Sequence, residues 1–296
     1  MSLVRRLKDV VNGLAASPSA WGALPRAAKH VKRRARRQRY RARLRAGDVD
    51  FVTLDELAVW TRALLRRLPT PIDAVVGIPR SGMIPASMLA TGLGRPLTTP
   101  ELLAEGRLWT SRLLDEPGAG SLRSVLLVDD SVDRGTTLDA ARRCVEAACG
   151  DLRISTLAVV AHRPEAAGLV DLHHIMLPHP TLFEWNLMHA KAMTTLSASL
   201  RGVLDRPGGV PRYAIDWVLA EGGEHDRRAI EAWLHEHEVR FEQLVLLDGR
   251  SAIEVLAGYR PDLHFEGSLP KARQIADATG IPTLSLEAME LVGSLR

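Results

Sequence analysis

The sequence SVLLVDDSVDRGTT, residues Ser124–Thr137, carries the clearest strand, turn and helix signals of the 296-residue chain. Its apolar run Val125–Val128 is long enough for a buried strand of a parallel sheet and too short to indicate a helix. Two acidic residues and a small polar turn follow this run. From Leu138 an amphipathic pattern predicts a helix that ends at Gly150. The stretch therefore predicts a strand–turn–helix unit of an open α/β sheet.

The predicted turn, Asp133–Thr137, is typical of a phosphate site. Its backbone N–H groups and the positive end of the following helix favour an anion. A nucleoside-triphosphate loop needs Lys after its last glycine, where this chain has Thr136, and the turn lacks GxGxxG. Two carboxylates beside a phosphate would repel it. We therefore expect Asp129 and Asp130 to face sugar hydroxyls and a Mg²⁺ ion at the carboxyl end of the strand.

A second phosphate-binding candidate follows the predicted strand Ile72–Ile78, before a helix predicted over Ile84–Leu93. Gly77 and Gly82 allow close backbone approach, and Arg80 can donate two hydrogen bonds to one anion. The alternative for Arg80 is a surface salt bridge.

These two motifs resemble one known family. Val125–Thr137 resembles the 5-phosphoribosyl 1-pyrophosphate (PRPP) loop of type I phosphoribosyltransferases at every position: four apolar residues, two acids, two small or apolar residues, Asp, a variable residue, Gly and Thr-Thr. The segment GIPRSG resembles the pyrophosphate loop of the same family, which also comes earlier in the chain. The resemblance implies a parallel sheet flanked by helices, Mg²⁺ as cofactor, and pentosyl transfer from PRPP. The implied PRPP-binding residues are Arg80, Ser81, Gly82, Asp129, Asp130, Asp133, Arg134, Gly135, Thr136 and Thr137.

The resemblance also implies catalytic roles. Asp129 and Asp130 would address the ribose hydroxyls, directly or through the metal. Asp133 would be the base, as in purine-type members, which predicts an acceptor that loses a proton, such as a purine N–H or a sugar hydroxyl. The segment 98–121 corresponds to a mobile flap, in which Arg107 and Arg112 are candidate pyrophosphate ligands.

The cluster Phe183-Glu184-Trp185-Asn186 is unusual in a chain with 4% aromatic residues. Glu184, Trp185 and Asn186 could form a wall that stacks on an acceptor ring, or Trp185 could pack against the sheet edge. The cluster resembles a motif of fused phosphoribosyltransferase–phosphatase proteins of bacterial polysaccharide assembly. That resemblance implies a glycan or lipid-linked saccharide acceptor, a β-ribofuranoside 5-phosphate product, and a separate phosphatase that removes the phosphate.

After a linker over 204–211, a second α/β pattern begins. It predicts strands over Tyr213–Leu219, Phe241–Leu247 and Pro282–Leu286, and helices over Asp226–Glu238 and Pro270–Thr279. Its tail, HFEGSLPKARQIADATGIPTLSL, resembles the end of a haloacid-dehalogenase-like (Rossmann-like) phosphatase domain. Such phosphatases need an Asp-x-Asp pair near the start of the domain, and the chain has none between His189 and Tyr213. We therefore expect a phosphatase-derived domain without phosphatase chemistry.

The distribution of charge along the chain indicates a basic N-terminal extension. Residues 1–47 carry fourteen Lys or Arg and one acid, a charge of +13 that leaves −9 for the remainder. This amphipathic, helix-forming segment could bind an anionic membrane surface, nucleic acid, or the acidic body of the protein itself. The two cysteines fall on one predicted helix, which fits a reducing cytoplasm rather than a disulfide framework. The expected location is cytoplasmic, with peripheral attachment at the inner face of the cell membrane.

Three functions follow from the sequence. The first is Mg²⁺-dependent phosphoribosyl transfer to a glycan hydroxyl. The second is a nucleobase phosphoribosyltransferase of salvage, and the third is a non-catalytic, PRPP-responsive regulator that binds nucleic acid. The predicted domains are an extension over 1–47, a phosphoribosyltransferase domain over 48–203 and a degenerate phosphatase-like domain over 211–296. A homo-oligomer is a further expectation.

Overall fold

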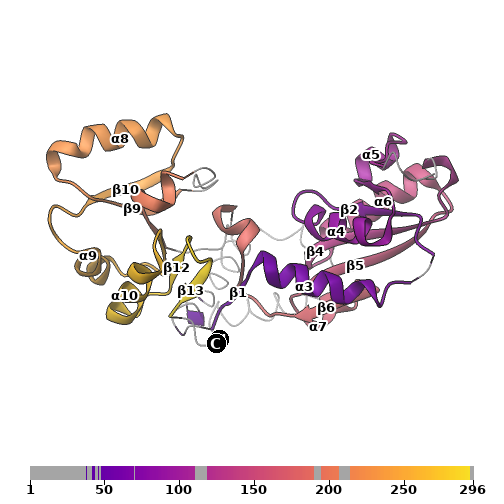
Figure 1. Ribbon diagram of the computed structural model, residues 1–296, viewed down its shortest axis with the longest axis horizontal. Helices are drawn as coiled ribbons and strands as arrows, with labels where there is room; N and C mark the ends of the chain where they lie inside the picture. Colours follow the sequence, from indigo (N-terminus) through magenta and orange to yellow (C-terminus); the bar gives the residue numbers. More distant parts are fainter. Residues whose placement is uncertain are drawn as a thin grey trace, which may run out of the picture. The chain divides into compact units, whose positions relative to one another are not determined.

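The computed structural model describes residues 48–69, 71–110, 119–189, 195–206 and 214–293, together with residues 38, 42, 43 and 46. The chain forms two compact units: Asp50–Leu187 is one, and the other includes Met188–Arg296 (Figure 1). The predicted basic extension, apart from those four residues, and Arg112 of the predicted flap lie outside the described residues. Within the described ranges, no helix has both the length and the apolar character needed to cross a bilayer.

The first unit is built on a parallel sheet, which confirms the predicted α/β fold. Its strand order is β3-β2-β4-β5-β6, and every neighbouring pair is parallel. The central strand β4 holds the apolar run and the acid pair. The strands are β2 (Ala74–Gly77), β3 (Leu97–Thr98), β4 (Ser124–Val132), β5 (Arg153–Ala161) and β6 (Leu172–Met176).

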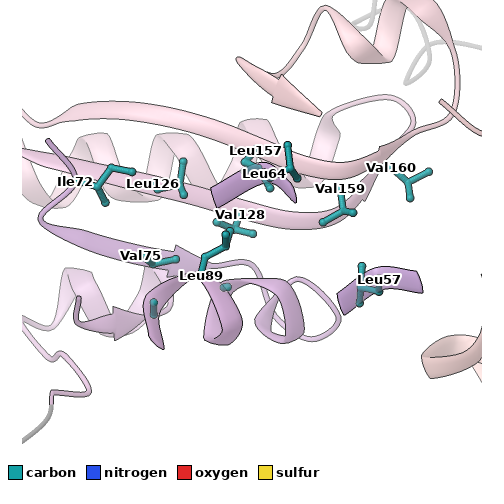
Figure 2. Packing of buried hydrophobic residues seen from close by; sticks show 12 residues of the cluster. Leu57, Leu64, Ile72, Val75, Leu89, Leu126, Val128, Leu157, Val159 and Val160 are labelled. Carbon is teal, nitrogen blue, oxygen red and sulfur yellow. The ribbon is translucent and has the colours of Figure 1, made fainter. Parts of the chain in front are cut away.

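Helices cover both faces of this sheet because its buried strands are apolar on both sides. The helices α3 (Leu54–Leu65) and α4 (Met83–Leu93) pack with Val75, Leu126 and Val128 on one face, the cluster that Figure 2 shows. The helices α5 (Pro100–Ala104) and α6 (Thr136–Cys149) pack on the alternate residues of the same strands. A short helix, α7 (Pro164–Ala167), follows β5.

A side-chain cap fixes the start of helix α3. Residues Asp50–Val52 form a short strand, β1, which pairs in parallel with β7 (Thr181–Phe183). The Thr53 hydroxyl accepts a hydrogen bond from Glu56 N, and the Glu56 carboxylate accepts one from Thr53 N. This reciprocal cap satisfies two N–H groups at the start of α3, so the helix starts at Leu54.

The second unit is also α/β. Its sheet has the order β10-β9-β8-β11-β12-β13, in which the pairing of β12 with β13 is antiparallel and every other pairing is parallel. The strands are β8 (Leu196–Ser199), β9 (Ile215–Ala220), β10 (Phe241–Leu246), β11 (Leu263–Glu266), β12 (Thr283–Ser285) and β13 (Glu290–Val292). The helices are α8 (Arg227–Glu236), α9 (Ala252–Tyr259) and α10 (Leu269–Thr279). Short helical turns lie at η3 (Ala119–Ser121), η4 (Glu184–His189) and η6 (Glu224–Asp226), and η5 (Leu200–Leu204) is an irregular turn with non-helical backbone angles at Arg201 and Gly202.

The division between the units lies earlier than the sequence predicts. Strand β8 falls inside the predicted first domain, which ends at residue 203, yet it pairs with β9 and β11 of the second sheet. The two units divide after Leu187. The sequence Leu-Ser-Ala-Ser of β8 has no strongly apolar run, so its burial at Ser197 and Ala198 comes from the neighbouring strands.

Candidate functional site

Two loops meet at the carboxyl edge of the first sheet. One is Pro79–Gly82, between β2 and α4, and the other is Asp133–Gly135, between β4 and α6. A Cβ atom added to Gly82 would lie 2.8 Å from Val128 O and 2.9 Å from the Asp129 Cα. Only a glycine therefore allows the first loop to approach the acid pair this closely.

Both loops end in helix N-termini without a side-chain cap. The N-cap residues of α4 and α6 are Gly82 and Gly135, which have no side chain to bond the first N–H groups. By contrast, Thr or Ser side chains cap α3, α5, α9 and α10. Gly135 has φ +71°, the left-handed region that favours glycine, and Thr136 and Thr137 after it are exposed. The N-termini of α4 and α6, at this edge of the sheet, thus lack a side-chain cap and favour anions.

Arg80 is exposed in the first loop and forms no ion pair with the residues that the structure describes. This disfavours the surface salt-bridge alternative. The peptide bond between Pro79 and Arg80 is cis, and Ser81 is half-buried. The guanidinium is therefore available to an incoming anion.

The two acids at the end of β4 differ in access. Asp130 is 4% exposed, and its Oδ2 accepts a 2.7 Å hydrogen bond from the Trp185 indole Nε1. Asp129 is half-buried, and its Oδ1 accepts a bond from Asp130 N. Burial, followed by the adjacent Asp130 carboxylate, raises the pKa of Asp129 well above its usual value. Asp129 is thus the acid that a ligand can reach.

This pair fits a Mg²⁺ ion only in part. Carboxylate oxygens suit Mg²⁺, and a nearby cation would relieve the repulsion between the two acids. Within the described ranges, however, no group of three or more His, Cys, Asp or Glu side chains could hold a metal. The donors present therefore fit an ion that takes most of its ligands from substrate oxygens and water.

Asp133 lies among cationic and imidazole groups. Its carboxylate is 3.3 Å from Arg163 Nε, 3.8 Å from His179 Nε2 and 3.9 Å from Arg134 Nε. Its carbonyl oxygen also accepts a 2.9 Å hydrogen bond from Arg163 Nε. The interaction with His179, followed by the charges of Arg163 and Arg134, lowers the pKa of Asp133 to about 2. Asp133 therefore stays ionised and is only a weak base.

A column of rings connects the surroundings of Asp133 to those of Asp130. His162 stacks on His179 with centroids 3.9 Å apart, contacts Phe183 at 5.8 Å, and Phe183 stacks on Trp185 at 4.8 Å. His162 Nδ1 donates to Leu177 O at 2.8 Å, which fixes its tautomer. Burial, followed by the charge of His179, lowers the pKa of His162 to about 4.

Sequence reasoning missed His162, Arg163 and His179. The sequence held a signal for two of them. His162 and Arg163 directly follow the buried strand β5, just as the acid pair lies near the end of β4. Parallel strands bring their carboxyl ends to one edge of a sheet, so these residues could have been grouped with Asp133.

The Glu184–Asn186 turn is partly used within the protein. Glu184 Oε2 accepts a 2.7 Å hydrogen bond from Leu54 N at the start of α3, and Trp185 bonds Asp130. Both contacts favour the packing interpretation over a free acceptor wall. Asn186 is half-buried.

Arg107 lies beside the edge strand β3. Its carbonyl accepts a 2.8 Å hydrogen bond from Thr98 Oγ1, and its exposed guanidinium is 3.3 Å from the Glu105 carboxylate. The structure thus does not bring it against the acid pair.

No family model matches the chain. Among solved structures, purine phosphoribosyltransferase from Pyrococcus horikoshii is 21% identical with a TM-score of 0.36, over 47% of this chain and 93% of that one. Xanthine-guanine-hypoxanthine phosphoribosyltransferase from Helicobacter pylori is 16% identical with a TM-score of 0.38, over 47% and 93%. Orotate phosphoribosyltransferase from Aeropyrum pernix is 20% identical with a TM-score of 0.30, over 42% and 72%. At such low identities and scores, the likeness assigns no activity to this chain.

The chain's own geometry defines the chemistry that the site can perform. Two helix N-termini without a side-chain cap lie at the same sheet edge as a half-buried carboxylate, and the loop before α6 also offers an ionised Asp133 held by basic side chains. A ligand with two separated phosphate groups and sugar hydroxyls between them would satisfy all three features.

Proposed function

We propose that the first unit is a Mg²⁺-dependent phosphoribosyltransferase that moves a 5-phosphoribosyl group from PRPP to an acceptor hydroxyl. The observation that carries this proposal is the pair of glycine-capped helix N-termini that flank Asp129 at one sheet edge. PRPP has the matching layout, with a diphosphate at C1, a phosphate at C5 and two hydroxyls between them.

The donor is held by the two loops. Arg80, Ser81 and the backbone of Gly82 bind the diphosphate at the start of α4. The backbone and hydroxyls of residues 133–137 bind the 5-phosphate at the start of α6. The carboxylate of Asp129 accepts hydrogen bonds from the ribose hydroxyls, while buried Asp130 lies behind it and is held by Trp185. Mg²⁺, when bound, would neutralise charge on the diphosphate, with Asp129 as the protein group best placed to hold it.

Bond cleavage at C1 precedes attack. As the bond between C1 and the diphosphate oxygen breaks, positive charge develops on the ribose ring and negative charge on the leaving group. Arg80 and the α4 N-terminus stabilise the leaving diphosphate, and Asp129 lies near the charged ring. Attack by an acceptor oxygen on the opposite face inverts C1 and gives a β-ribofuranoside 5-phosphate.

Asp133 takes the acceptor's proton late. Its pKa of about 2 makes it too weak to deprotonate a free hydroxyl. As the new bond to C1 forms in the transition state, the acceptor oxygen becomes strongly acidic, so a weak carboxylate base suffices to take its proton there. The charges of Arg163 and Arg134 keep Asp133 ionised for this step.

A glycan hydroxyl is the proposed acceptor, on a lipid-linked saccharide at the inner membrane face. The resemblance of the Phe183–Asn186 motif to proteins of polysaccharide assembly, the fused second unit and the basic extension support this choice. We further propose that the second unit derives from a haloacid-dehalogenase-like phosphatase and lacks its chemistry. Strand β8 ends in Ser199, and Asp205 in the same segment accepts a 2.6 Å hydrogen bond from Gly202 N. A separate phosphatase would then remove the 5-phosphate.

Nucleobase salvage is the second candidate, because an acid at the Asp133 position equally suits a purine N–H. A non-catalytic regulator that binds nucleic acid through the basic extension is the third.

Pyrophosphate release tests these alternatives. The full-length protein is incubated with PRPP, Mg²⁺ and, in separate reactions, hypoxanthine, guanine, orotate and saccharide acceptors. The proposal predicts release with a saccharide, and turnover of nucleobases alone would replace it with salvage. PRPP-responsive, salt-dependent DNA or RNA binding without turnover would support the regulator.

The role of Asp133 has its own test. Asp133→Asn should lower the rate by about 10²–10⁴ while PRPP binding persists. Asp151→Asn is the matched control, since Asp151 is exposed just before β5, at the opposite edge of the sheet. An unchanged rate in Asp133→Asn would remove the base assignment.

The membrane proposal is tested by liposome flotation with and without residues 1–47. Binding to anionic vesicles should require those residues, and binding that survives their deletion would contradict it.

A further inference from the structure

The second unit has a cavity of its own at the carboxyl edge of its sheet. The cavity has a volume of about 450 Å³ and is lined by residues between Ser199 and Ile275. Across the sheet, β9 and β10 follow β8 on one side, and the next strand in the chain, β11, lies on the other side of β8. The loops after β8 and β11 therefore lead in opposite directions. In open α/β sheets, the crevice at such a switch point is where ligands bind.

The last residues of these two strands, Ser199 and Glu266, form the polar floor of the cavity. Glu266 is 5% exposed, and its Oε1 accepts hydrogen bonds from Gly267 N at 2.8 Å and Ser268 N at 3.3 Å. Its Oε2 accepts a 2.8 Å hydrogen bond from Ser199 Oγ. The buried His264 imidazole lies 3.7 Å behind that oxygen.

These contacts keep Glu266 ionised. Burial opposes ionisation, but the nearby His264 imidazole and the hydrogen bond from Ser199 outweigh it and lower the pKa of Glu266. A carboxylate oxygen has more than one acceptor site, so Oε2 can also accept a hydrogen bond from a ligand hydroxyl.

The rim of the cavity is positively charged. Arg201 Nη1 lies 3.8 Å and Lys271 Nζ 4.0 Å from the two oxygens of Glu221. One carboxylate between two cations leaves a positive charge uncompensated. Both cationic side chains are largely solvent-accessible, at 84% and 62%. The first turn of α9, at Ala252 and Ile253, also lines the cavity and adds the positive end of a helix.

Between the floor and the rim the wall is apolar. Leu219 and Ile275 are each 3% exposed and belong to the core of this unit. Such a surface suits the carbon face of a sugar ring.

We propose that this cavity binds a phosphorylated sugar, with its phosphate at Arg201 and Lys271 and its hydroxyls at Glu266 and Ser199. Arginine and lysine at the rim match the charge and geometry of a phosphate. A volume near 450 Å³ lies in the range of small-molecule sites. The ligand is bound and not chemically changed. This inference does not depend on the activity of the first unit.

The test is calorimetric titration of the full-length protein with ribose 5-phosphate. The phosphate turn of the first unit is first blocked by Thr137→Glu, a change at an exposed residue, and circular dichroism checks that the fold is intact. Saturable binding should remain in this background. Adding Arg201→Gln with Lys271→Gln should weaken it by at least about tenfold. Arg273→Gln is the matched control, because Arg273 lies on the same helix but pairs with Glu290 at 3.1 Å.

Two further titrations test the ligand class. Inorganic phosphate should bind at least about tenfold more weakly than ribose 5-phosphate, because it has no sugar hydroxyls for the floor. Glu266→Gln should lower the affinity for ribose 5-phosphate but not for inorganic phosphate. Three results would each overturn the proposal. They are no binding in the Thr137→Glu background, an affinity that Arg201→Gln with Lys271→Gln leaves unchanged, or an equal affinity for inorganic phosphate.

Discussion

Protonation of His162 should destabilise the first unit under mildly acidic conditions. The imidazole is 6% exposed, stacks on His179 and donates to Leu177 O. Its pKa is lowered from 6.5 to about 4, so the native state resists a proton that the unfolded chain takes up near pH 6.5. The stability that the neutral ring contributes is therefore complete above pH 6.5 and is lost as the pH falls towards 4. The loss amounts to about 2 kcal/mol at pH 5 and about 3 kcal/mol at pH 4.

The variant His162→Asn isolates this effect. Its amide can still donate to Leu177 O but does not titrate. It should be less stable than wild type at pH 7 because ring packing is lost. Between pH 7 and pH 5, however, wild type should lose about 2 kcal/mol more than the variant.

Hydrogen exchange of the slowest β5 amides, corrected for the intrinsic pH dependence of exchange, reports the opening free energy of the first unit alone. His235→Asn, at an exposed histidine of α8, should follow wild type. Equal losses in wild type and His162→Asn would refute the assignment of a buried, neutral ring.

Two further substitutions test contacts at the site by chemical denaturation. Gly82→Ala should destabilise the first unit by about 1–3 kcal/mol, because its methyl group would meet the backbone at Val128 and Asp129, which cannot move aside. Gly120→Ala is its control, with nothing within 4 Å of the added atom, and equal effects of the two would contradict the close approach. Trp185→Phe keeps a ring but removes the donor to buried Asp130, at a cost of about 1–3 kcal/mol. Trp109→Phe, at a side chain that is 51% exposed, should cost little, and a cost as large as that of Trp185→Phe would argue against the indole bond.

The features predicted correctly from the sequence have local causes. The apolar run before Asp129 lies within β4, the strand that it predicts, and Gly150 directly follows α6, the helix whose end it predicts. In the same way, Gly135 marked the turn that the structure places at the start of α6.

Contacts between distant residues were not predictable in this way. Trp185 reaches Asp130 across 55 residues of sequence, and His179 approaches Asp133 from a different loop. These contacts follow from strand order, which no local pattern encodes. For the same reason the residues of β8 fell in the first predicted domain, although β8 pairs with β9 and β11, which lie later in the chain.

The surroundings of Asp133 change the chemistry expected from the sequence. An acid in this loop predicts a base, but its pKa is set by Arg163 and His179, which only the fold brings near. The proposed late proton transfer follows from that environment.

Calorimetric titration of the full-length protein with PRPP and Mg²⁺ tests the central claim most directly. The account predicts saturable binding that Asp129→Asn weakens by at least about tenfold and Asp151→Asn leaves unchanged. Absence of binding heat from well-folded protein would contradict it, and so would an affinity for PRPP that Asp129→Asn leaves unchanged.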